Sequence, residues 1–108
     1  FKSVKVRTID ELEILIKCRY NFCRYLWLNQ QTERAISETF ETIGICLKNN
    51  SFYCLANLYC LLGNVSEGFA NKDAVKQYFV TAQHAYLLEG NDKMALDLER
   101  FINETFPA

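Results

Sequence analysis

The residue types that could perform chemistry are one histidine, five cysteines and a cluster of acids near the N-terminus. His84 lies in the middle of a helical pattern, and no cysteine stands at a spacing that would place its thiol against the imidazole for nucleophilic catalysis. Zinc sites need three or four ligands at short, recurring spacings, which scattered cysteines and a single histidine do not supply. We therefore expect no metal and no cofactor.

The acid cluster consists of Asp10, Glu11 and Glu13. In the first turn of a predicted helix, acids complement the positive end of the helix dipole, so this cluster has a structural explanation. The sequence also lacks a Gly-rich phosphate loop, a GxSxG elbow and an HExxH motif. These absences predict that the chain is not an enzyme.

A run of aromatic and basic side chains is the strongest candidate for a binding site. A helix turns about 100° per residue, so these residues cannot all face one core. Tyrosine and arginine are enriched among the residues that anchor protein interfaces. The side chains predicted to face away from the core and bind a partner protein or peptide are Lys17, Arg19, Tyr20, Arg24 and Tyr25. Alternatively, the two tyrosines pack on neighbouring helices of this chain or of a longer solenoid.

Composition narrows the class of protein. The chain has 108 residues, is 50% hydrophobic and has a net charge of −1, which excludes a disordered tail and predicts one helical domain over residues 1–108. We expect no nucleic-acid partner, since that would require a strongly basic face. We also expect no membrane partner, because no stretch reaches the roughly 18 apolar residues of a span. The opening at Phe1 suggests a fragment of a longer helical-repeat protein, or a complex subunit.

The cysteines bear on localisation. An odd number of cysteines leaves at least one free thiol in any scheme within one chain, no CxxC occurs, and free cysteines are usually buried. We therefore predict core thiols in an intracellular protein, cytoplasmic or nuclear. Against this, three Asn-x-Ser/Thr sequons begin at Asn49, Asn64 and Asn103. They favour the alternative of a secreted, glycosylated helical bundle of cytokine or effector type with disulfides.

Hydrophobic periodicity is helical almost throughout and predicts helices at 9–28, 32–48, 52–62, 72–89 and 92–105. Thr8 and Glu11 form a capping box before the first helix, and Asn71 is placed to cap the fourth. Gly63 and Gly90 are predicted to end helices, with a long loop over 63–71. The fold class is therefore all-α, with about five antiparallel helices in a stack or bundle.

Apolar stripes predict which side of each helix is buried. In the second helix the predicted core stripe is Ile36, Phe40, Ile43 and Leu47. In the fourth helix it is Val75, Phe79, Ala82 and Tyr86.

The C-terminal part, 72–108, resembles a tetratricopeptide-type helix pair. The residues that match the motif are Phe79, Ala82, Tyr86, Gly90, Ala95 and Pro107. A second half-match runs from Phe52 to Gly63. The resemblance implies a right-handed stack with an extended binding surface, and hence a non-catalytic protein–protein interaction scaffold. An unpaired fifth helix would favour either a capping role or self-association.

The run from Cys18 to Ser37, with the apolar helix and long loop that follow, is also similar to a stretch of the helical superhelix of separases or their partners. No counterpart of a separase protease domain is present, so this likeness implies no catalysis.

Overall fold

The computed structural model describes residues 8–107, which are all-α, as predicted. The helices are α1 (Ile9–Leu28), α2 (Thr32–Lys48), α3 (Leu55–Ser66), α4 (Lys72–Leu88) and α5 (Asp92–Thr105). The predicted bounds of α1, α2 and α5 are confirmed, and α4 ends one residue earlier than predicted. None of the helices within 8–107 is both long enough and apolar enough to cross a membrane.

The helix starts follow the predicted capping chemistry. The Thr8 hydroxyl accepts a hydrogen bond from the Glu11 amide at 3.0 Å, so an otherwise unpaired N–H of α1 is satisfied. The side-chain oxygen of Asn71 does the same for the Ala74 amide, at 2.8 Å. Gly90 has φ of +78°, the left-handed conformation that closes α4 and that glycine adopts without strain.

The bounds predicted for the third helix are wrong at both ends. The helix begins after Cys54, which has φ of +58°, and it continues through Gly63 to Ser66. Gly63 is buried inside α3, where a Cβ atom would lie 2.7 Å from the ring of Phe79 in α4. This glycine therefore allows two helices to approach closely and does not end one. The turn that follows is short and contains Gly68, with φ of +88°.

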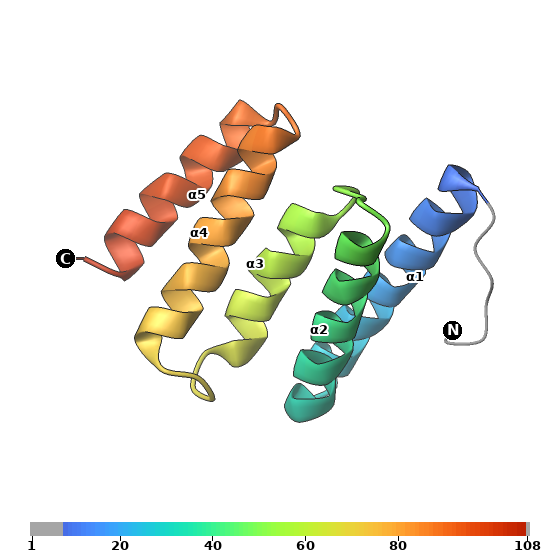
Figure 1. The fold of residues 1–108 in the computed structure, drawn as a ribbon. Coiled ribbons are helices and arrows are strands. Elements are labelled where there is room, and N and C mark those ends of the chain that lie inside the picture. Colours follow the sequence, from blue (N-terminus) through green and yellow to red (C-terminus); the bar gives the residue numbers. More distant parts are fainter. Residues whose placement is uncertain (1–7, 108) are drawn as a thin grey trace.

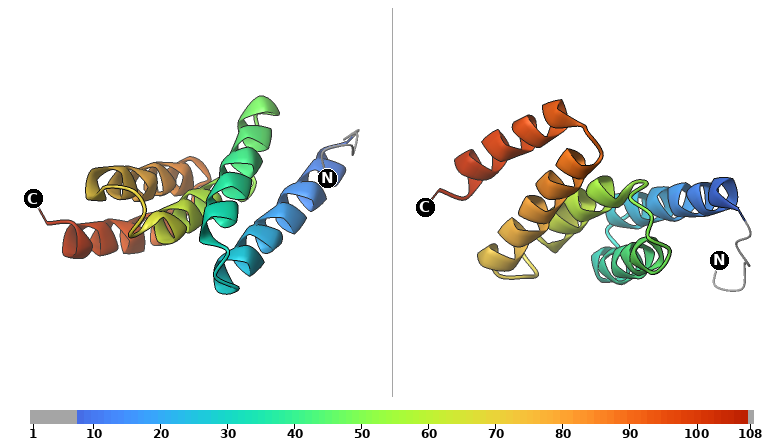
Figure 2. Two further views of the ribbon diagram at one scale, coloured as in Figure 1. Left: turned by 90° about the horizontal axis from the view of Figure 1, so that it is seen from below. Right: turned by 45° about the horizontal axis from the view of Figure 1, so that its top comes forward.

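The helices lie side by side in chain order, with α1 and α5 at opposite ends and successive helices antiparallel (Figure 1). Each helix packs mainly on its neighbours in sequence, and α1 also contacts α3. The result is an elongated stack of 45 × 32 × 19 Å, seen from two further directions in Figure 2. One apolar cluster joins α1, α2 and α3, and a second joins α3, α4 and α5.

The predicted core stripe of α2 is confirmed for Ile43 and wrong for Phe40 and Leu47, whereas that of α4 is confirmed throughout. Phe40 and Leu47 are exposed, and the helix instead buries Ala35, Thr39, Thr42, Ile43 and Cys46. The two threonines can be buried because each hydroxyl donates to the carbonyl oxygen four residues before it, at 2.6 Å for Thr39 and 2.8 Å for Thr42. The buried face of α2 is consequently more polar than its hydrophobic periodicity predicts.

Candidate protein-binding interface

The predicted partner-binding residues do not form one surface. All five lie on α1, but Lys17, Arg24 and Tyr25 are exposed, whereas Tyr20 is half-buried and Arg19 is buried. The structure therefore brings three of the five to the outer side of the stack. The other two belong to the packing of α1 on the rest of the chain.

Arg19 is only 2% exposed, so the expectation that it faces a partner is wrong. Its Nη2 atom lies 3.0 Å from a carboxylate oxygen of Glu38 and 3.5 Å from one of Glu41, both on α2. Its Nε donates a hydrogen bond to the Thr42 hydroxyl at 3.0 Å. A buried charge is tolerated when it is paired in this way. Arg19 thus joins α1 to α2.

A signal for this role was present in the sequence. Arg19 stands three residues after Ile16 and four before Cys23, which is the spacing of the buried side of α1. Glu38 and Glu41 are three residues apart, so they share one face of the next helix. A lone cation on a buried face, followed by two acids on one face of the adjoining helix, indicates an interhelical ion pair.

Tyr20 packs inward and contacts the exposed side chain of Arg24. Its ring packs against the first apolar cluster, and burial raises the pKa of its hydroxyl. The guanidinium carbon of Arg24 lies 5.8 Å from the centre of that ring, within the range of a cation–π contact. The prediction that Tyr20 points away from the core is therefore wrong, and Tyr20 instead positions Arg24.

The outer side of α1 carries a second apolar stripe, which the sequence analysis missed. Its members, here called the α1 seam, are Ile14, Cys18, Asn21, Tyr25 and Leu28. They alternate at spacings of four and three residues, the pattern by which helices pair in coiled coils. All are exposed, and Ile14, Tyr25 and Leu28 expose 64%, 56% and 68% of their surface. The opposite side of α1 is buried, so this helix has an apolar stripe on both sides.

Charged residues flank the seam on one side. Asp10, Lys17 and Arg24 stand seven residues apart, so they line the same edge of α1. All three are exposed. The edge is therefore acidic in the first turn and basic over the rest of its length.

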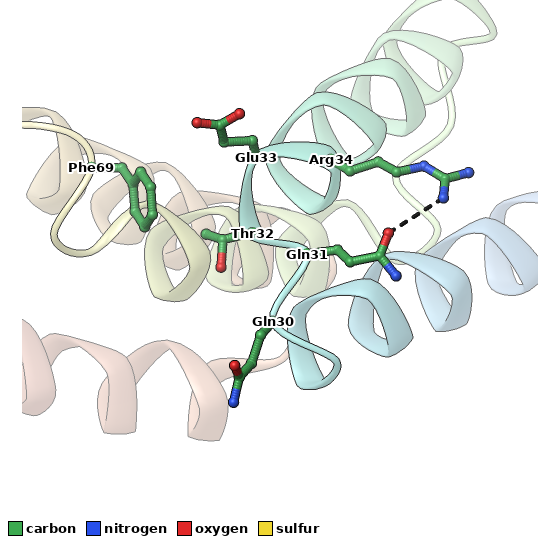
Figure 3. Close-up of a pocket in the computed structure, with 6 residues that line it drawn as sticks. All are labelled: Gln30, Gln31, Thr32, Glu33, Arg34 and Phe69. Atoms are coloured by element: carbon green, nitrogen blue, oxygen red, sulfur yellow. Dashed lines mark hydrogen bonds between the residues drawn. The ribbon is translucent and has the colours of Figure 1, made fainter.

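A shallow hollow of about 450 Å³ lies where the turn between α1 and α2 approaches the turn between α3 and α4 (Figure 3). It is lined by Gln30, Gln31, Thr32, Glu33, Arg34 and Phe69. An Arg34 nitrogen donates to the Gln31 side-chain oxygen at 3.5 Å. These lining residues include one carboxylate, one guanidinium and one hydroxyl.

The cysteines occupy different environments. Cys23 and Cys46 are buried as predicted, Cys54 and Cys60 are partly buried, and Cys18 is exposed on the α1 seam, contrary to prediction. Burial raises the pKa of the Cys46 and Cys60 thiols to about 11. A raised pKa makes a thiol a poor nucleophile at neutral pH.

The remaining residues singled out in the sequence lie apart from one another. His84 is exposed on α4. Within 8–107, no three His, Cys, Asp or Glu side chains are grouped closely enough to hold a metal ion. The sequon asparagines Asn49, Asn64 and Asn103 are all exposed, although Ser66, which completes the second sequon, is buried in α3.

Comparisons with protein-family models, with curated proteins and with solved structures found no match to this chain.

Proposed function

We propose that the chain is a non-catalytic protein–protein interaction scaffold that binds its partner through the outward face of α1. The observation that carries this proposal is the α1 seam, which is an exposed apolar stripe at coiled-coil spacing on a helix whose other side is already buried. Exposed apolar surface that is contiguous and flanked by polar residues marks interaction sites. Covering such a stripe with a partner removes apolar area from water, at about 25 cal/mol per Å².

The residue types of this face also support the proposal. Tyrosine and arginine dominate the energetic centres of interfaces, and Tyr25 and Arg24 are neighbours in the sequence and both exposed. Arg24 is held over the ring of Tyr20, so less side-chain entropy is lost when it meets a partner. The face therefore combines apolar area with a positioned cation.

The scaffold is proposed to be tetratricopeptide-like. In support, Ala82 and Ala95 are buried between α4 and α5, where small residues permit close approach of antiparallel helices. Tyr86 is also buried, and its hydroxyl donates to the Asn57 side-chain oxygen at 2.5 Å. Stacked helices of this kind offer extended binding faces. An intracellular location belongs to the same proposal and is supported by the thiols of Cys23 and Cys46, which pack as core residues.

Site-specific photocrosslinking in cells of the source organism tests the proposal. A benzophenone amino acid replaces Cys18 in the α1 seam and, as the control, exposed His84 on α4. We expect a discrete adduct from position 18 that is lost in Leu28→Gln and kept in Leu88→Gln. Adducts of equal yield at both positions, or none from position 18, would contradict a binding role for α1.

A further inference from the structure

We infer that the occupant of the α1 seam is an amphipathic helix of another protein, which lies along α1 with acidic residues opposite Lys17 and Arg24. This inference rests on the proposed function and deepens it, because it states the shape and the charge of the partner.

The spacing of the seam indicates a helix. Ile14, Cys18, Asn21, Tyr25 and Leu28 follow one line along α1. From Ile14 to Leu28 the seam therefore extends about 21 Å, at 1.5 Å per residue. A second helix that crosses at a shallow angle can insert its side chains between these residues over that whole length.

The charges beside the seam indicate acidic flanks on the partner. Lys17 and Arg24 line one edge at the seven-residue interval at which paired helices exchange charges. The third cation of α1, Arg19, is engaged with Glu38 inside the stack and adds nothing to this edge. Opposite charges along an edge select the partner and orient it, and like charges reject the wrong one.

Asn21, in the middle of the seam, places a further requirement on the sequence of the partner helix. Asn21 is the one amide among seam residues that are otherwise apolar, aromatic or thiol. A single polar residue at such a position fixes the register of paired helices when the partner offers it a hydrogen bond. We therefore expect a polar side chain in the partner's stripe opposite Asn21.

A second copy of this chain fits less well. If two α1 helices pair antiparallel with Ile14 beside Tyr25, Lys17 of one copy faces Arg24 of the other, and like charges meet. If they pair parallel and in register, Glu11 meets Glu11. Both arrangements bring charges of the same sign together, and their repulsion disfavours pairing of two α1 helices. The charges of α1 thus favour a different, acidic helix.

The test uses two synthetic three-heptad peptides. Both carry leucine along one stripe with a central asparagine. In the first peptide, called the acidic peptide, glutamate flanks the stripe, and in the second, called the basic peptide, lysine does. Binding of each labelled peptide to the full chain is followed by fluorescence anisotropy at low ionic strength. We expect the acidic peptide to bind at least about tenfold more tightly than the basic peptide.

Two pairs of variants provide matched controls. Lys17→Glu/Arg24→Glu reverses the charges beside the seam, and Lys93→Glu/Arg100→Glu makes the same change in net charge at two exposed, seven-spaced positions of α5. The first should invert the preference to the basic peptide and the second should leave it unchanged. Similarly, Leu28→Gln should weaken binding about tenfold, and Leu88→Gln, at an equally exposed leucine near the end of α4, should not.

Each remaining outcome bears on one proposal or the other. If both peptides bind equally, with loss in Leu28→Gln but no response to charge reversal, the acidic chemistry is wrong while α1 stays a binding face. If neither peptide binds, or if Leu88→Gln weakens binding as much as Leu28→Gln, the inferred helical partner is overturned. The proposed function is then decided independently by the crosslink from position 18.

Discussion

The guanidinium of Arg19 lies 3.0 Å from the carboxylate of Glu38, within the contact between α1 and α2. Arg19, which the sequence predicts to bind a partner, is therefore buried between two helices of the chain. Of the three cations of α1, Arg19 therefore stabilises the fold, whereas Lys17 and Arg24 are exposed to solvent.

Arg19→Ala should destabilise the chain strongly. The substitution leaves Glu38 and Glu41 close together without their shared cation and removes the hydrogen bond to Thr42. The carboxylates left behind are partly exposed, so the loss of their partner and of the buried hydrogen bond should cost about 1–3 kcal/mol. Urea unfolding followed by circular dichroism measures the change. Arg24→Ala is the control and should change the free energy of unfolding by less than about 0.5 kcal/mol. Equal effects of the two substitutions would show that Arg19 is not a structural residue.

Two glycines inside helices should respond oppositely to alanine. At Gly63 a Cβ atom would lie 2.7 Å from the Phe79 ring, so Gly63→Ala should cost about 1–3 kcal/mol through overpacking. At Gly44, in α2, a Cβ would meet nothing within 4 Å, so Gly44→Ala should stabilise the chain by about 0.5–1 kcal/mol. Thermal unfolding of both variants checks the prediction. A stabilising Gly63→Ala would mean that α3 and α4 are not packed as described.

Stability should fall in alkaline solution. Burial raises the pKa of the Cys46 thiol from 9.0 to about 11, so the folded chain keeps a proton that the unfolded chain releases. The stabilisation is therefore complete below about pH 9 and is lost as the pH rises to about 11. The loss is about 1.4 kcal/mol per pH unit for one such thiol.

The slope of the free energy of unfolding against pH measures this effect. Cys46→Ala should reduce the slope between pH 9 and about pH 11, whatever its effect on stability at neutral pH. An unaltered slope in Cys46→Ala would contradict the burial of that thiol.

Tyr25→Ala should leave the stability of the chain nearly unchanged. Tyr25 exposes 56% of its surface, so its truncation should change the free energy of unfolding by less than about 0.5 kcal/mol. Phe79, which is 4% exposed and lies in the second cluster, provides the comparison, and Phe79→Ala should cost about 3–5 kcal/mol. The two melting temperatures report the difference. A comparable loss in Tyr25→Ala would mean that Tyr25 belongs to the core.

Local signals in the sequence are sufficient to predict the bounds of most helices and which side of α4 is buried. Helix starts such as Asn71 depend on hydrogen bonds within one turn, and the periodicity of α4 reports directly which side is buried. The end of α3 could not be predicted in this way. A glycine that closes a helix and a glycine that admits an aromatic ring from another helix appear identical in a sequence, and the Phe79 ring beside Gly63 decides between them.

Only part of the candidate site could be predicted from the sequence, because the rest depends on how α1 packs against other helices. Tyr25, Lys17 and Arg24 were identified because their types are frequent at interfaces, but the α1 seam was not recognised. Periodicity does not show that a helix at the end of the stack formed by residues 8–107 has neighbours on one side only, so it could not identify the seam as exposed. Burial of Arg19 likewise depends on acids in a different helix.

The most direct test of the binding role of α1 is an NMR titration of the isotopically labelled chain with the acidic peptide. We expect the amide signals of Asn21, Tyr25 and Leu28 to shift progressively and saturate, while those around Leu88 and across α5 stay in place. Shifts confined to α4 and α5, or no shifts at any peptide concentration, would contradict that role.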